Sequence, residues 1–124
     1  MSKQAEIYLG NPNLKKANVA YDFSPEDVKE FVKCSQDPVY FIREYIRIVS
    51  LDEGIIPFTM YDFQEDMVAR FHKHRFNIAK LPRQSGKSTI VTAYLLWYVL
   101  FNDNVNVAIL ANKAATAREM LGRL

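Results

Sequence analysis

The sequence predicts an α/β fold, in which a helical N-terminal region is followed by the start of a parallel-sheet domain. Three observations favour this class. Apolar residues recur at helical spacing up to residue 75, the pattern then becomes extended, and strand-like and helix-like segments alternate from there to the C-terminus. With 49% hydrophobic and 24% charged residues, the composition excludes disordered and low-complexity proteins.

Residues 1–23 contain a Gly-Asn-Pro-Asn stretch and few apolar anchors, so we expect an irregular N-terminal arm there. Residues 24–58 are predicted to form a helical N-terminal subdomain. Its first helix is expected to begin after Ser24, because a serine hydroxyl caps free backbone N–H groups and Pro25 suits the first helical position.

The second helix of this subdomain is expected to begin after Asp37, which again precedes a proline. Its apolar residues keep helical spacing as far as Val49, and Gly54 and Pro57 are expected to end the element. The Asp52-Glu53 pair follows an apolar run and looks like the acidic end of a strand. Because its neighbours have helical periodicity, we interpret the pair as a helix end instead.

Residues 59–124 are predicted to form the front part of the α/β domain, with a third helix capped by Thr59. The later elements are strand, helix, strand and helix, at residues 76–81, 87–101, 105–111 and 113–124. The first of these helices is apolar around most of its circumference and needs more cover than two parallel strands provide. We therefore expect the domain to be incomplete at its C-terminus.

Basic residues are concentrated in the second half of the chain. Residues 1–66 contain 7 Lys/Arg and 12 Asp/Glu, whereas residues 67–124 contain 9 and 2. Such asymmetry favours a polyanion, either a nucleic acid or a nucleoside phosphate, near the second half. A solvated basic helix end would explain the composition equally well.

Secretion and membrane insertion are not expected. The N-terminus lacks the apolar region of a signal peptide, and no apolar stretch reaches the length of about 18–20 residues that a membrane span requires. The only cysteine, Cys34, cannot form an internal disulfide, which is typical of a reduced cytosolic protein.

The residues with the clearest chemistry follow the first predicted strand. Gly86-Lys87-Ser88-Thr89 matches the end of the phosphate-binding pattern G-x-x-x-x-G-K-[ST]. Gly86 would let the backbone curl around phosphates, Lys87 would neutralise the β- and γ-phosphate oxygens, and Ser88 would ligate Mg²⁺. A preceding strand and a following helix are the context that such a P-loop requires.

The loop departs from the pattern at one position and carries one unusual residue. Leu81 stands where the first glycine is expected, and Arg83 lies inside the loop. A guanidinium at this position would reach the γ-phosphate and act as an arginine finger supplied in cis. The alternative is an exposed or ion-paired loop residue without a catalytic role.

The loop at residues 83–88 resembles the Walker A motif of the large terminase subunits of T-even-like tailed phages. Residues 37–54 resemble the helical N-terminal region of that family, 58–64 its adenine-recognising Q motif, and 110–113 the motif after the next strand. The similarity covers about residues 36–124, with the motifs in the right order. It implies a P-loop NTPase domain in residues 59–124.

The resemblance also implies roles for individual residues. Gln64 would contact adenine through its side-chain amide, although an exposed polar position on an amphipathic helix is the simpler alternative. Lys113 would be a coupling or DNA-facing residue, against the alternative of a plain cation at a helix start. The residues expected to contact ATP are Gln64, Gln84, Ser85, Gly86, Lys87, Ser88 and Thr89.

By the same resemblance, the intact protein would bind ATP and Mg²⁺ to power the packaging of duplex DNA into a prohead. Its partners would be duplex DNA, the portal protein, the small terminase subunit and further copies of itself in a ring. It would act in the host cytoplasm, transiently at the portal of the prohead.

The hydrolytic acid is missing from the expected place. ATP hydrolysis in this class needs an apolar strand ending in Asp-Glu, and the only acids after the loop are Asp103 and Glu119. The nuclease domain is missing as well, so whether this chain is itself an enzyme stays open. Two other interpretations remain, namely part of a helicase-like ATPase with an additional strand, and a short non-enzymatic module that binds a nucleotide or another anion.

Overall fold

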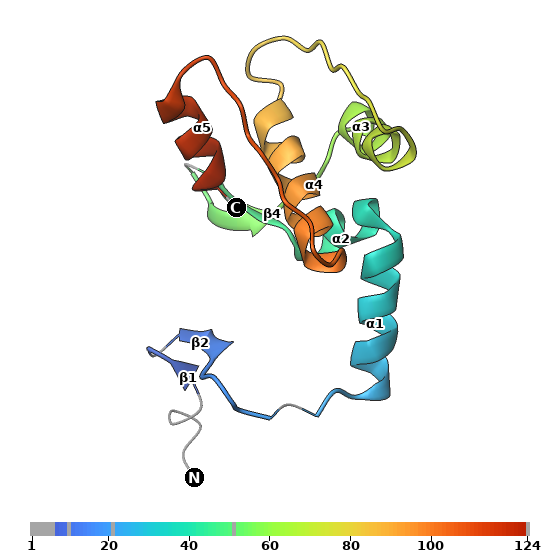
Figure 1. The fold of residues 1–124 in the computed structure, drawn as a ribbon, viewed down its shortest axis with the longest axis vertical. Coiled ribbons are helices and arrows are strands. Elements are labelled where there is room, and N and C mark those ends of the chain that lie inside the picture. The colour runs from blue at the N-terminus through green and yellow to red at the C-terminus, as the bar shows by residue number, and fades with distance from the viewer. Residues whose placement is uncertain (1–6, 10, 21, 51, 124) are drawn as a thin grey trace.

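The computed structural model describes residues 7–9, 11–20, 22–50 and 52–123. These residues form a small α/β structure with five helices and two separate two-stranded antiparallel sheets (Figure 1). The helices are α1 (Pro25–Gln36), α2 (Pro38–Tyr45), α3 (Asp62–Lys73), α4 (Lys87–Phe101) and α5 (Ala114–Leu121). The strands are β1 (Ile7–Tyr8), β2 (Asn11–Lys15), β3 (Arg47–Ser50) and β4 (Gly54–Pro57).

The first two helix starts are confirmed. The Ser24 hydroxyl accepts a hydrogen bond from the backbone N–H of Asp27 at 3.1 Å, and the Asp27 carboxylate accepts the N–H of Ser24 at 2.9 Å. This reciprocal pair is a capping box. Asp37 caps α2 by accepting the N–H of Tyr40 at 3.0 Å. Each cap satisfies a helical N–H that has no acceptor within its own helix.

The predicted length of the second helix is wrong. α2 ends at Tyr45, and β3 and β4 then form an antiparallel hairpin in which Ser50 lies opposite Gly54. Asp52 and Glu53 lie in the turn, so they are not a helix end, and their N–H groups donate to the Ser50 hydroxyl at 3.4 Å. The β-branched residues of both strands favour extended backbone, and the φ of 75° at Gly54 suits a glycine in a turn.

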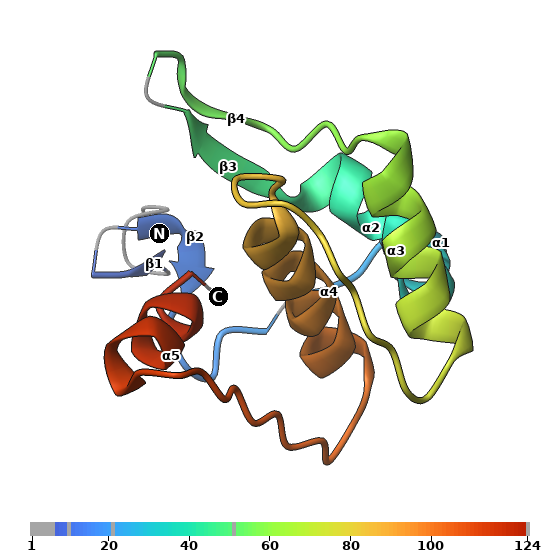
Figure 2. The same cartoon turned by 90° about the horizontal axis from the view of Figure 1, so that it is seen from above.

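The two predicted parallel strands, residues 76–81 and 105–111, are not strands in the structure. They run along different sides of α4 and do not pair with each other (Figure 2). A strand needs a neighbour for its backbone hydrogen bonds, and no parallel pair occurs among the described residues. Several apolar side chains of these segments lie in solvent as a result, with Phe76 82% and Leu110 89% exposed, whereas Leu81 packs against the core.

The core lies where α4 packs against α2 and α3 (Figure 2). Its buried side chains come from these helices, from α1 and from the segment before α3, and they are Cys34, Phe41, Ile42, Phe58, Met60, Met67, Val68, Ile90, Ala93 and Trp97. An ion pair between Arg43 and Glu65 also joins α2 to α3. The start of α4 is therefore held beside α3 by the core, which fixes the position of the loop that precedes it.

The N-terminal arm contains a hairpin that the sequence pattern did not predict. β1 pairs with β2 in antiparallel register, with Ile7 opposite Lys15, and Figure 1 shows the hairpin apart from the helices. Other parts of the expected irregular arm, including residues 1–6, lie outside the described residues. In the described part of the chain, no helix is long and apolar enough to cross a membrane.

Candidate functional site

The loop before α4 has the backbone shape that its sequence requires. Gly86 is the N-cap of α4 with a left-handed φ of 73°, and Gln84 is also left-handed, with a φ of 59°. The carbonyl of Gly86 accepts the N–H of Ile90 at 3.0 Å, which closes the first helical turn. A side chain at residue 86 would be strained in this conformation, so the glycine serves the tight entry into the helix.

The first turn of α4 presents groups that attract an anion. The N–H groups of Lys87, Ser88 and Thr89 lie at the start of the helix, where an α-helix offers them no internal acceptor. The positive end of the helix dipole and the ammonium group of Lys87 add to the attraction. This part of the chain can therefore hold a phosphate group.

The side chains of the loop are turned onto its own backbone. The Lys87 ammonium donates to the carbonyl oxygen of Pro82 at 3.1 Å, and the Ser85 hydroxyl donates to the same oxygen at 3.0 Å. Both donors are thus held across the loop by one acceptor. A phosphate oxygen that bound Lys87 would replace the Pro82 carbonyl as its partner.

Gln64 is brought to this loop from α3. Its side chain is only 2% exposed, so the alternative of an exposed polar position is wrong. The amide oxygen accepts the N–H of Tyr61 at 3.0 Å, and the amide nitrogen donates to the carbonyl of Ser85 at 3.3 Å. Tyr61, and not Thr59 as predicted, is the N-cap of α3, because the Gln64 side chain satisfies its backbone N–H.

Gly86 leaves the space that Gln64 occupies. A Cβ atom at residue 86 would lie 2.6 Å from the Gln64 amide nitrogen, which is far inside van der Waals contact. Gln64 thus contacts the loop at Ser85 and Gly86. Lys87 joins the same group through the Pro82 carbonyl, which it shares with the Ser85 hydroxyl.

Residues 78–123 match a known family, described as "Terminase large subunit, T4likevirus-type, N-terminal". The resemblance to a terminase large subunit is thereby confirmed. The match contains the whole loop and Lys113, whereas Gln64 lies before its first residue. The match supports a terminase role for the chain.

Arg83, Gln84 and Lys113 take no part in the contact between Gln64 and the loop. Arg83 and Gln84 are exposed in the turn of the loop. Lys113 is the N-cap of α5 and is also exposed. No group of three or more His, Cys, Asp or Glu residues that could hold a metal ion occurs in the part of the chain that the structure describes.

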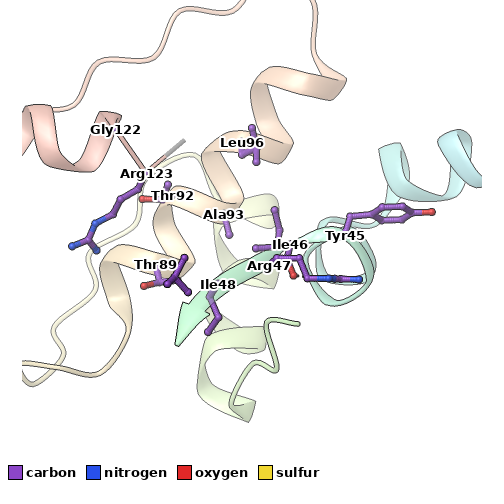
Figure 3. A pocket seen from close by; sticks show the side chains of 11 residues that line it. Tyr45, Ile46, Arg47, Ile48, Thr89, Thr92, Ala93, Leu96, Gly122 and Arg123 are labelled. Carbon is purple, nitrogen blue, oxygen red and sulfur yellow. Dashed lines mark hydrogen bonds between the residues drawn. The ribbon is translucent and has the colours of Figure 1, made fainter. Parts of the chain in front are cut away.

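A cavity of about 700 Å³ lies beside this region, between β3, α4 and the end of α5 (Figure 3). Thr89 and Thr92 of α4 face it, together with apolar residues of β3 and α4 and the side chains of Arg47 and Arg123. Of the residues expected to contact ATP, only Thr89 lines this cavity. The loop and the cavity therefore meet at Thr89 alone.

Sequence reasoning missed two backbone groups at this site, the carbonyl of Pro82 in the loop and the N–H of Tyr61 at the start of α3. Nothing in the sequence marks the Pro82 carbonyl, because its role depends on the path of the loop. The Tyr61 contact has a signal, since a glutamine at the third helical position is typical of a capping box. Tyrosine is unusual before that position, and Thr59 appeared to be the better cap.

Proposed function

We propose that this chain binds ATP and Mg²⁺ at the loop of residues 82–89, as the ATP-binding part of a terminase large subunit. Residues 59–124 would belong to a P-loop NTPase domain whose ATPase powers the packaging of duplex DNA. One observation carries the proposal. The residues of the terminase match include a loop whose Gly86 is left-handed and whose Lys87 and Ser88 open a helix.

The proposed roles follow from the positions of the residues. Lys87 would leave the Pro82 carbonyl for the β- and γ-phosphates, while backbone N–H groups of residues 84–89 bind phosphate oxygens. Ser88 would place its hydroxyl on Mg²⁺, which neutralises phosphate charge when bound. Arg83 is free of the core and would approach the γ-phosphate as a finger in cis.

Gln64 keeps the capacity to contact adenine. Its amide has two N–H donors and a carbonyl oxygen with two lone pairs, and the contacts to Ser85 and Tyr61 use one of each. The remaining N–H and lone pair match the donor and acceptor edge of adenine. The amide is nearly buried, so the base would have to approach it closely.

The partners of the motor belong to the proposal. They are duplex DNA, the portal protein, the small terminase subunit and further copies of the chain in a ring, with the host cytoplasm and the prohead portal as the place of action. The excess of basic residues after residue 66 supports a polyanionic partner. Lys113, exposed at the start of α5, would be a coupling or DNA-facing residue.

We assign the role of the acid in ATP hydrolysis to none of the four acidic residues considered for it. Asp103 lies in a turn, and Glu119 forms an ion pair with Arg123. Asp52 and Glu53 lie in the turn of the β3–β4 hairpin. We therefore expect the chain to bind ATP and to hydrolyse little of it.

The proposal is tested by titrating the purified 124-residue chain with Mg-ATP in a calorimeter, alongside Lys87→Ala. A hydrogen bond to a charged group is worth about 1.5–3 kcal/mol, so the variant should lose at least about tenfold in affinity. Lys80→Ala is the matched control, since Lys80 is an exposed lysine just before the loop. A folded Lys87→Ala chain with the affinity of the wild type would refute the proposed phosphate site.

A further inference from the structure

We infer that Gln64 is a positioning residue that holds the loop of residues 82–89 in its anion-binding shape before any nucleotide arrives. The inference deepens the proposed function and rests on it for its ligand, but the contact itself exists in the unliganded chain. The resemblance gives Gln64 the recognition of the base. The structure assigns its amide first to the loop that would hold the phosphates.

The first support is that the amide is fixed at both ends. Its oxygen is held by the N–H of Tyr61 at the start of α3, and its nitrogen holds the Ser85 carbonyl. Because α3 packs on α4 through the core, this amide links the loop to the rigid part of the fold. A side chain held at one end by a helix cap cannot follow the loop if the loop moves.

The second support is the direction of the peptide that Gln64 holds. In a planar trans peptide the carbonyl and the following N–H point in opposite directions, and no cis peptide occurs in the described residues. When Gln64 binds the Ser85 carbonyl, the N–H of Gly86 must therefore point away from α3. That N–H becomes a donor on the side of the loop away from Gln64, where it is free to meet an anion.

The third support is the cost of losing the contact. Gln64 is nearly buried, and a buried amide without partners is destabilising. The absence of a side chain at Gly86 is what lets the amide reach this place. Burial, the missing Cβ and the two hydrogen bonds all favour one arrangement of the Ser85–Gly86 peptide.

Base reading and loop positioning predict different ligand dependence. If Gln64 reads adenine, its removal weakens ATP alone. If it positions the loop, its removal also weakens triphosphate ligands without adenine, such as GTP and tripolyphosphate. Gln64→Met keeps the length and the neutral charge of the side chain but removes both hydrogen bonds.

The first experiment needs no ligand. The {¹H}-¹⁵N heteronuclear NOE of residues 84–87 is measured for the wild type, Gln64→Met and Gln64→Glu, with Gln36→Glu at the exposed end of α1 as the matched control. Gln64→Glu keeps the oxygen that caps α3 but turns the donor toward Ser85 into an acceptor. We expect lower NOE values in both Gln64 variants and no decrease in the control. Unchanged values in Gln64→Glu, with its helix cap intact, would overturn the inference.

The second experiment compares the affinities of Gln64→Met for Mg-ATP, Mg-GTP and Mg-tripolyphosphate with those of the wild type. Losing the hydrogen bond to the Ser85 carbonyl should weaken GTP and tripolyphosphate about three- to tenfold, and ATP by at least as much. A loss confined to ATP would overturn the inference and leave Gln64 as a base contact. If the wild type binds none of the three, the proposed function fails, while the NOE values still decide whether Gln64 holds the loop.

Discussion

The indole N–H of Trp97 donates a hydrogen bond of 2.7 Å to the backbone carbonyl of Cys34. This carbonyl lies in the last turn of α1, where its helical partner would be the N–H of residue 38. Residue 38 is a proline, which has no N–H, so the end of α1 leaves the Cys34 carbonyl without a helical donor. Trp97 of α4 supplies the missing donor and ties α1 to the core.

Trp97→Phe should therefore destabilise the chain by more than the loss of ring volume alone would. The side chain is 3% exposed, and the substitution leaves both a small cavity and a buried carbonyl without a donor. We expect a loss of about 2–3 kcal/mol in the free energy of unfolding, measured by urea denaturation with far-ultraviolet circular dichroism. The control is Tyr98→Phe, because the neighbouring Tyr98 is partly exposed. Equal stability of the two variants would show that the Cys34 contact contributes nothing.

Gly86→Ala should destabilise the chain for two separable reasons. The left-handed φ of 73° strains an alanine, and the new Cβ meets the Gln64 amide at 2.6 Å. The strain alone costs about 1 kcal/mol, and the clash adds to it. In a Gln64→Ala background the clash disappears and only the strain remains.

A double-mutant cycle of Gly86→Ala and Gln64→Ala measures this difference. We expect the effect of Gly86→Ala on the free energy of unfolding to be at least about 0.5 kcal/mol smaller in the Gln64→Ala background. Additive effects within about 0.3 kcal/mol would mean that the two residues do not meet in solution.

Local patterns in the sequence predicted the features that depend on near neighbours. Ser24 and Asp37 cap helices because their side chains reach N–H groups three residues ahead, and a pattern of that length is visible in the sequence. The backbone conformation of Gly86 was likewise predictable, since a tight entry into a helix favours a residue without a side chain. These features depend little on the rest of the fold.

The features that were missed depend on segments far apart in the sequence. Val49 keeps helical spacing with α2, but it lies in β3 because β4 is present to pair with it. Residues 76–81 have a strand-like composition, yet no strand lies beside them in the described part of the chain. The burial of Gln64 depends on how α3 and α4 meet, which periodicity alone does not reveal.

The exposure of residues 76–80 can be tested directly. Ile78 is fully exposed, whereas Ile90 at the start of α4 is fully buried. The same substitution should therefore change the free energy of unfolding little at Ile78 and strongly at Ile90. Ile78→Ala should change the free energy of unfolding by less than about 0.5 kcal/mol, whereas Ile90→Ala should cost about 2–5 kcal/mol. Both are measured by urea denaturation. If Ile78→Ala lost as much free energy of unfolding as Ile90→Ala, this segment would be packed into a sheet in solution.

Stability at high pH should depend on a cluster around Glu30. Its carboxylate accepts hydrogen bonds from the hydroxyls of Tyr40 at 2.7 Å and Tyr45 at 2.9 Å. The bond to Glu30 raises the pKa of Tyr45 from 10.0 to about 12. A raised pKa stabilises the fold fully below the unfolded value and less as the pH rises through the folded value. The contribution of Tyr45 should therefore fade between pH 10 and about 12.

The measurement is the urea midpoint of the wild type and of Tyr45→Phe across this range. The advantage of the wild type should be constant below pH 10 and should shrink above it, because ionised Tyr45 can no longer donate to Glu30. Tyr61→Phe is the control, since Tyr61 is an exposed tyrosine outside the cluster. A constant difference through pH 12 between the wild type and Tyr45→Phe would contradict the contact.

The same cluster predicts the opposite dependence in acid. The hydrogen bonds from Tyr40 and then Tyr45 lower the pKa of Glu30 below its ordinary 4.5. A lowered pKa stabilises the fold above the unfolded value, and the contribution is lost as the pH falls through the folded value. The wild type should therefore be more stable than Glu30→Gln at neutral pH, with an advantage that shrinks below pH 4.5. Glu44→Gln, at an exposed position near the end of α2, is the control. If Glu30→Gln matched the wild type at neutral pH, the two tyrosines would not be holding the carboxylate.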